Sequence, residues 1–393
     1  MKKIIAVFIA ALMMLSLFAC NNGNSSTSDS SANTQNTDAA PPASSASGDS
    51  QPAASGSVGW ITDEVDHFAR PTYKIAYIVA FYVAVNATLS DQLKLWAEKL
   101  NFEYTLVDAQ QDNDSFMNSL ETLAGQGYDG FILDFNPEAT ERCYELCQEL
   151  GVNWISGVNP VVVDDKQLWP GVTLDSFSMG QLMSQWLYDN YSSYWGDVDI
   201  NDIGMIVCDN SGPIDLHLRC LGSEDRFREL FPDTYATNMF NADMAGLDFA
   251  PQSGYDRFTA IKSANPQIKY WLVTSVADLY ALGVVRAAEA LGAENETLIL
   301  CADGYSLISE WESGYNGDCF TGAAYIAPVY HTEPIVCGLI AMIDGRVTPE
   351  NLWPEWKAPG QDYADLQLEL TVITRHNYNE YKATAEAYWD SIK

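Results

Sequence analysis

Polar side chains stand directly after several apolar runs of strand length. They are Asp108-Ala109-Gln110, Asp134-Phe135-Asn136, Asn159, Asp175, Asp209-Asn210, Asp243 and Asp303. Ligands of open α/β sheets bind outside the carboxyl ends of the strands, where these carboxylates and amides would meet them. The alternative is that an Asp or Asn after a strand caps the next helix. We expect some of these residues to act in each way.

Motifs of common enzymes do not stand in the context that their chemistry requires. The GxGxxG match from Gly125 to Gly130 precedes a strand pattern, so it predicts a helix end and a turn rather than a dinucleotide site. Gly304-Tyr305-Ser306 begins like a nucleophile elbow but lacks the last glycine. The stretch from Asp197 to Cys208 lacks the glycine and glutamate of a calcium loop.

Histidines and cysteines give no catalytic or metal-binding pattern either. The histidines are His67, His217, His331 and His376, and the cysteines after Cys20 are Cys143, Cys147, Cys208, Cys220, Cys301, Cys319 and Cys337. Cys143 and Cys147 have helical spacing, which a metal site could use, but we expect buried thiols. A disulfide between Cys208 and Cys220, or between Cys301 and Cys319, stays open. We expect no catalytic residue, no metal and no cofactor.

The first residues predict export and a lipid anchor. Lys2 and Lys3 precede an apolar run, residues 4–18, which is short for a membrane span. The run ends in Leu17-Phe18-Ala19-Cys20, the form of a lipoprotein signal peptidase site. Residues 1–19 are therefore expected to be a signal peptide, with Cys20 as the lipid attachment site. Residues 20–59 are expected to form a disordered linker because they hold almost no large apolar side chain.

The net charge of the chain limits the classes of molecule that it is expected to bind. Lys and Arg number 20 against 53 Asp and Glu, which gives a formal net charge of −33. Phosphate groups repel such a chain, so we do not expect nucleic acid or anionic lipid surfaces as partners. We expect a small neutral ligand.

The remaining residues alternate between strand and helix patterns. The strand patterns are residues 74–81, 103–109, 130–135, 153–158, 172–175, 203–209, 237–243, 270–276, 298–303 and 320–327. The amphipathic patterns are residues 89–100, 116–124, 140–150, 180–191, 215–230, 256–264, 279–291 and 332–343. Such alternation predicts parallel sheets covered on both faces, and the length of the chain favours two lobes.

Four stretches in this order resemble the type I periplasmic sugar-binding proteins, the ribose, galactose and arabinose binders of bacterial ABC transporters. They are residues 74–79, residues 106–112 with an Asp-x-Gln strand end, residues 281–287, and residues 300–304 with their Asp303-Gly304 ending. The resemblance implies an α/β fold of two Rossmann-like lobes with parallel sheets, joined by three hinge strands. It places residues 73–174 and 328–366 in the first lobe, 175–327 and 367–375 in the second, and 376–393 in a C-terminal helix.

The resemblance also implies ligand-binding residues in the second lobe. Arg219, followed by Gly222, matches the family's RxxG arginine, whose planar guanidinium donates to two adjacent hydroxyls. The alternative for Arg219 is a surface ion pair with Asp215 or Glu224. Asp303 matches a carboxylate that accepts from hydroxyls, with a helix N-cap as the alternative. Asp278 matches a third position, although the family's preceding Asn is replaced by Ala277.

The first lobe departs from the family pattern. Ala84-Val85-Asn86-Ala87 replaces the usual aromatic pair, so we expect Phe81 and Tyr82 to offer an aromatic face or to be core, and Asn86 to contact ligand. Asn159-Pro160 stands where the ribose binders have Asp-Arg, which argues against ribose. Asp175 is expected to be a ligand contact or a hinge cap. The segment 240–254, which includes Met244, Leu247 and Phe249, is where we expect a further aromatic wall.

These expectations describe a monomeric, lipid-anchored extracytoplasmic protein that captures a monosaccharide or similar polyol and delivers it to an ABC permease. Two alternatives keep the fold: a ligand-presenting sensor subunit, and a binder of a nucleoside or furanone signal. A third alternative is an extracellular enzyme on a Rossmann-like scaffold, which would require an activated nucleophile, a metal site or a perturbed acid pair in the cleft. The pair to check is Asp278 with Asp303, which would favour acid–base chemistry if the two were close together with no positive neighbour.

Overall fold

The computed structural model describes residues 65–392. The expected signal peptide, Cys20 and the linker 20–59 lie outside the described residues. No helix among residues 65–392 has the length and apolarity that a membrane crossing requires.

The first lobe is built on a six-stranded parallel sheet in the order β13-β7-β4-β3-β1-β2. Its strands are β1 (Tyr73–Val79), β2 (Phe102–Asp108), β3 (Gly130–Asp134), β4 (Asn153–Ser156), β7 (Gly171–Leu174) and β13 (Asp365–Leu368). The helices of this lobe are α1 (Ala84–Lys99), α2 (Asn113–Gly125), α3 (Thr140–Leu150) and α10 (Pro328–Ile343), with a 3-10 turn η1 (Pro137–Ala139). β1 and β3 are buried almost throughout, as central parallel strands must be.

The second lobe is built on a six-stranded sheet in the order β14-β12-β11-β10-β8-β9. Its strands are β8 (Ile203–Asp209), β9 (Met239–Asp243), β10 (Tyr270–Ser275), β11 (Thr297–Ala302), β12 (Phe320–Tyr325) and β14 (Thr371–Thr374). Its helices are α4 (Ser176–Trp195), α5 (Ile214–Leu230), α6 (Tyr235–Asn238), α7 (Pro251–Ala264), α8 (Asp278–Ala290) and α9 (Tyr305–Glu312), with η2 (Ile200–Asp202) and η3 (Glu294–Glu296). Only β14 runs antiparallel, on β12.

Smaller elements complete the described chain. A two-stranded hairpin, β5 (Val162–Val163) with β6 (Lys166–Gln167), lies between β4 and β7 in the sequence. Two 3-10 turns, η4 (Pro349–Asn351) and η5 (Pro354–Trp356), follow α10. The C-terminal helix α11 (Tyr378–Ser391) contacts both α10 and β14.

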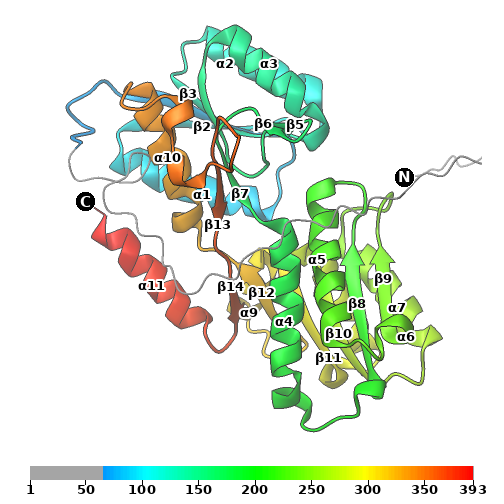
Figure 1. Ribbon diagram of the computed structural model, residues 1–393. Helices are drawn as coiled ribbons and strands as arrows, with labels where there is room; N and C mark the ends of the chain where they lie inside the picture. The colour runs from blue at the N-terminus through cyan, green and yellow to red at the C-terminus, as the bar shows by residue number, and fades with distance from the viewer. Residues whose placement is uncertain (1–64, 393) are drawn as a thin grey trace, which may run out of the picture. The chain divides into compact units, whose positions relative to one another are not determined.

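The chain passes between the two sheets three times. The passages run from β7 to α4, from β12 to α10, and from β13 to β14, where the dark red strands follow one another directly in Figure 1. The last change of sheet falls after Leu368, not after Leu366 as the expected boundary had it. The reason is that the parallel pairing of β13 with β7 continues through Gln367 and Leu368.

Local differences from the sequence expectations have simple causes. The strand expected at 237–243 begins at Met239 because Tyr235–Asn238 form α6. The GxGxxG match does end a helix: α2 stops at Gly125, and Gly127 takes a positive φ of 77°. The short hairpin β5–β6 had no periodic signal long enough to predict it.

Two glycines let α4 and α5 touch through their backbones. A Cβ on Gly180 would lie 2.0 Å from the Arg219 carbonyl oxygen, and a Cβ on Gly222 would lie 2.0 Å from the Phe177 carbonyl oxygen. Ser223 Oγ also donates to the Gly180 carbonyl at 3.1 Å. This close crossing fixes the position of α5, and therefore of Arg219, against the rest of the lobe.

We predict that Gly222→Ala destabilises the protein by about 2–3 kcal/mol, because the new methyl meets backbone that cannot move without separating the helices. Gly125→Ala is the matched control, since its Cβ would meet nothing within 4 Å. We expect the control to be neutral or slightly stabilising, since Gly to Ala in a helix gains about 0.5–1 kcal/mol. Urea unfolding of both variants checks this, and equal midpoints would contradict it.

Candidate ligand-binding site

A carboxylate with two amide partners marks the end of β3 in the first lobe. Asp134 is the last residue of β3, and its two oxygens accept from Asn86 Nδ2 at 2.6 Å and from Asn159 Nδ2 at 3.2 Å. Asn86 lies in the first turn of α1 and also donates to the hydroxyl of Tyr77 at 3.0 Å. The structure thus brings two predicted site residues, Asn86 and Asn159, onto Asp134, which was noted only as part of the strand-end pattern.

Asp134 is partly protonated near neutral pH. Burial raises its pKa from 3.8 to about 7, the hydrogen bond from Asn86 opposes the rise, and Asp215 of the second lobe adds to it. A carboxyl group in this range can donate as well as accept a hydrogen bond, so it matches hydroxyl groups in either orientation.

Arg219 on α5 is the buried cation of the second lobe. Its Nη1 donates to Asp303 Oδ2 at 3.0 Å and to the Val276 carbonyl at 2.9 Å. Its Nε has no hydrogen-bond partner among the described residues. The surface ion pair with Asp215 or Glu224, which was the alternative, is wrong, because Arg219 is only 6% exposed.

Asp303 is held by an unusual backbone. It follows β11 with a φ of 70°, a left-handed conformation that Asp tolerates better than most residues. Gly304 follows with a φ of 77°, and a Cβ there would lie 2.5 Å from the Cβ of Ala323. The two residues together turn the chain sharply at the strand end, so that the carboxylate of Asp303 meets Arg219.

Asp278 begins α8 beside this pair. Its Oδ2 accepts from the Ser306 amide at 2.7 Å, and burial raises its pKa while that hydrogen bond lowers it. Its charge and that of Asp303 both act on Arg219. Asp278 and Asp303 therefore have Arg219 as a positive neighbour. An acid pair that could act in acid–base chemistry was expected to have none.

The polar groups of the two lobes interact. Asp215 on α5 influences both Asp134 of the first lobe and Arg219 of the second. His331 lies in the first turn of α10, and the charge of Asp303 in the second lobe raises its pKa, against the larger effect of burial. Charged groups of one lobe thus shift the pKa of groups in the other lobe.

An aromatic contact accompanies them. The rings of Phe81, after β1, and Phe249, before α7, meet edge to face with centroids 6.4 Å apart. Phe249 also packs on Tyr280 at 5.0 Å. Phe81 and Tyr82 are 38% and 40% exposed, so neither is core. In the segment expected to supply an aromatic wall, Phe249 makes this contact, whereas Met244 is buried and Leu247 faces solvent.

Asp175 acts as a helix cap. Its Oδ1 accepts from the Ser178 amide at 2.9 Å and its Oδ2 from the Ser178 hydroxyl at 2.6 Å, at the N-terminus of α4. This is the hinge-cap alternative, because α4 follows the first passage between the sheets. A ligand role for Asp175 stays a prediction.

His331 is a residue that sequence reasoning missed. Its side chain is buried, its Nε2 lies 2.8 Å from the Gly157 carbonyl, and its Nδ1 has no partner among the described residues. Burial lowers its pKa, so the ring is neutral, with Nε2 donating and Nδ1 left as an acceptor. Nothing in the spacing of the four histidines could have indicated this.

The seven cysteines of the described chain are all buried and free. The two disulfides that the sequence left open are absent among residues 65–392. Cys143 and Cys147 are buried thiols, as expected.

A surface hollow of about 480 Å³ lies apart from these groups, along α2. Asp112, Asp114, Ser115 and Asn118 are among its lining residues. None of the side chains described above lines it, so it has no part in the site.

Comparison with known proteins identifies the fold. No family model matches the sequence, and no curated protein does. Among solved structures, the chain is similar to an ABC transporter periplasmic solute-binding protein from Actinobacillus succinogenes with bound D-allose. The TM-score is 0.62 and the identity 14%, over 79% of this chain and 100% of that one.

Two further structures are similar over nearly their whole length. An ABC transporter solute-binding protein from Bacillus halodurans with bound myo-inositol has a TM-score of 0.58 and 17% identity, covering 80% of this chain and 98% of its own. A galactofuranose-binding protein has a TM-score of 0.60 and 16% identity, covering 80% and 99%.

This chain has the type I periplasmic binding protein fold. The fold class expected from the sequence is confirmed. Asp134, Asp303 and Asp278 stand at or just after the carboxyl ends of parallel strands, which is where ligands of open α/β sheets bind.

The raised pKa of Asp134 predicts how stability depends on pH. The folded-state pKa of Asp134 is above the ordinary value. Its contribution to the free energy of unfolding is therefore complete below about pH 4 and is lost as the pH rises through 7. A difference of about three pKa units corresponds to at most about 4 kcal/mol. We expect wild type to lose about 2–4 kcal/mol relative to Asp134→Asn between pH 4 and 8.

Urea unfolding at intervals across that range measures the difference. Asp256→Asn on α7 is the control, since Asp256 is exposed and should leave the wild-type curve unchanged in shape. Parallel curves for wild type and Asp134→Asn would mean that the Asp134 pKa is not raised.

Proposed function

We propose that this protein is an extracytoplasmic solute-binding protein that captures a monosaccharide or similar polyol between its lobes and delivers it to an ABC import permease. Its work is binding rather than catalysis. The observation that carries the proposal is the ion pair of the buried Arg219 with the partly exposed Asp303, in which the guanidinium Nε has no partner among the described residues.

The chemistry of the site suits a neutral polyhydroxylated ligand. Arg219 is compensated by Asp303 and by the nearby Asp278 and Asp215, so the site does not require an anionic ligand. The free guanidinium donor, the carboxylates and the Asn86–Asp134–Asn159 group offer both donors and acceptors, as adjacent hydroxyls require.

The aromatic residues add an apolar surface. Phe81, Tyr82 and Phe249 are available to pack against the C–H face of a sugar ring, which hydroxyl-directed groups cannot satisfy. The similar structures support this ligand class, because they contain D-allose and myo-inositol, and a third is a galactofuranose-binding protein.

Attachment to the membrane through Cys20 belongs to the same proposal. It rests on the apolar run and the Leu-Phe-Ala-Cys sequence, residues 17–20. We expect wild type expressed in a bacterium to sediment with membranes and Cys20→Ser to lose this lipid-dependent retention. Membrane retention and lipid labelling that are unchanged in Cys20→Ser would contradict the anchor.

A thermal-shift screen of the purified chain tests the ligand class. Panels of monosaccharides, polyols, nucleosides and amino acids would be compared, with each compound in excess. A ligand at about 100 times its dissociation constant adds about 2.7 kcal/mol of stability. We expect one or a few sugars or polyols to raise the melting temperature. A shift by nucleosides or amino acids alone would overturn the proposed ligand class.

With the ligand in hand, we predict that Arg219→Ala weakens binding by about 2–3 kcal/mol, the value of charge-assisted hydrogen bonds to two hydroxyls. Because the alanine variant leaves Asp303 unpaired and can lose stability, Arg219→Lys is measured beside it. Lysine keeps the charge but lacks the planar donors, so the affinity of Arg219→Lys for the ligand should also fall.

Arg228→Ala is the matched control. Arg228 lies on the same helix, but its side chain is 56% exposed and its ion pair is with Asp225. Isothermal titration of the folded variants gives the affinities. Wild-type affinity in both Arg219 variants would remove Arg219 from the site.

A further inference from the structure

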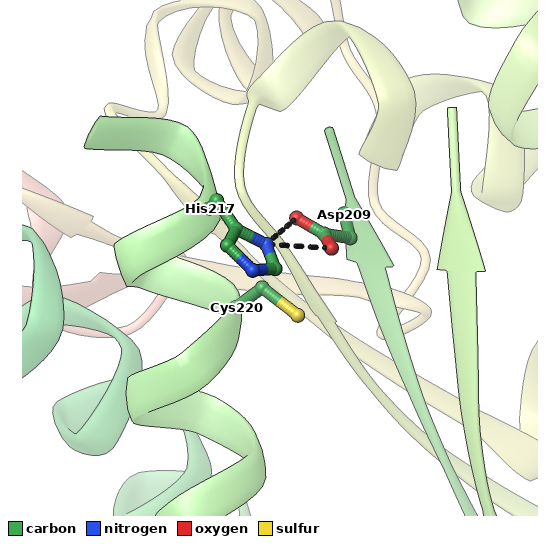
Figure 2. Close-up of side chains that lie close together, drawn as sticks. All are labelled: Asp209, His217 and Cys220. Carbon is green, nitrogen blue, oxygen red and sulfur yellow. Dashed lines mark hydrogen bonds and ion pairs between the residues drawn. The ribbon is translucent and has the colours of Figure 1, made fainter. Parts of the chain in front are cut away.

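Three side chains with metal-binding atoms converge at the end of β8, and no enzyme or ligand role uses them. Asp209 is the last residue of β8, and His217 and Cys220 lie one turn apart on α5. Figure 2 shows the imidazole beside the carboxylate, with Nδ1 at 3.0 and 3.3 Å from its two oxygens and the sulfur of Cys220 nearby. One ligand atom from each residue lies within 4.8 Å of the others.

A second carboxylate stands beside the sulfur. Glu224 is one turn further along α5, and its Oε1 lies 3.7 Å from Cys220 Sγ. Asn241 of β9 bridges the group, because its Nδ2 lies 3.0 Å from Glu224 Oε1 and 3.4 Å from both Asp209 Oδ2 and Cys220 Sγ. Oxygen, nitrogen and sulfur atoms of Asp209, His217 and Cys220 therefore lie around one small volume, and the Glu224 carboxylate stands beside the sulfur as a fourth potential ligand.

The charges of the group are unbalanced. No lysine or arginine among residues 65–392 forms an ion pair with Asp209 or Glu224. His217 is bonded to Asp209, and it also acts on Asp243, whose carboxylate is bonded to Ser211. A divalent cation would compensate the two carboxylates, of which Asp209 is only 1% exposed.

The group is separate from the site of Arg219, although Arg219 and Cys220 are neighbours in sequence. Successive residues of a helix point about 100° apart. Arg219 meets Asp303 and Val276, whereas Cys220 meets Glu224 and Asn241. The side chain of His217 is 30% exposed, which gives an ion a path from solvent.

We propose that Asp209, His217, Cys220 and Glu224 form a zinc-binding site. Mixed oxygen, nitrogen and sulfur donors suit Zn²⁺, whose bonds to them are about 2.0–2.3 Å, and not Ca²⁺, which takes oxygen. On binding, the Cys220 thiol gives its proton to solvent as the sulfur–metal bond forms. The ion replaces the hydrogen bond between His217 and Asp209: the proton on Nδ1 leaves to solvent while Nε2 takes one up, so that the neutral imidazole binds the ion through Nδ1.

Titration of the full-length, metal-free chain with zinc chloride tests the proposal. We expect one zinc ion to bind per chain, with proton release, and calcium chloride to give no such signal. Cobalt(II) should produce a sulfur-to-metal charge-transfer band, the signature of a thiolate ligand. None of these readouts involves sugar, so the result is independent of the proposed transport function.

His217→Ala and Cys220→Ser are the test variants, with His376→Ala and Cys143→Ser as controls of the same residue types. We expect at least about 100-fold weaker zinc binding in His217→Ala. The charge-transfer band should be absent in Cys220→Ser, and both controls should behave as wild type. His217 is partly exposed, so its variant is expected to fold, which circular dichroism verifies.

Two results would overturn the site. One is zinc binding and a thiolate band that persist unchanged in folded His217→Ala and Cys220→Ser, which would place the metal elsewhere. The other is the absence of stoichiometric zinc binding by the wild-type chain.

Discussion

The ion pair between the buried Arg219 and the partly exposed Asp303 is the interaction on which the packing of the second lobe depends. A guanidinium that is 6% exposed would be costly without its carboxylate. Several local features serve the pair. The glycine contacts between α4 and α5 hold the helix that carries Arg219, and the left-handed turn at Asp303 and Gly304 aims the carboxylate. The packing of helices in this lobe thus has a direct effect on the electrostatics of the site.

In the first lobe, the carboxyl group of Asp134 is stabilised without a cation. Asp134 is surrounded by neutral donors, the amides of Asn86 and Asn159, so burial is relieved by hydrogen bonds and by partial protonation rather than by an opposite charge. The polar groups at the strand ends of the two lobes therefore differ in kind. One is a fixed charge pair and the other is a carboxyl whose proton is exchangeable near neutral pH.

The sequence predicted the fold well, because parallel strands buried on both faces give long apolar runs that are hard to mistake. It also indicated Arg219 and Asp303, whose neighbours in sequence carry a recognisable pattern. It could not predict the meeting of Phe81 with Phe249, or the role of His331, because those contacts join residues far apart in the chain. The surface ion pair considered for Arg219 failed for the same reason, since burial of the residue depends on three other elements.

The C-terminal helix adds a restraint of its own. After β14 leaves the second sheet, α11 returns to the first lobe, where Trp389 meets Trp96 edge to face at 4.8 Å and the Tyr388 hydroxyl donates to Glu333. Its Tyr381 hydroxyl accepts from the amide of Ala327, at the second passage between the sheets. Helix α11 thus adds a further connection between the lobes, beyond the three passages of the chain. A relative motion of the lobes must therefore either carry α11 along with the first lobe or break its contacts with Trp96, Glu333 and Ala327.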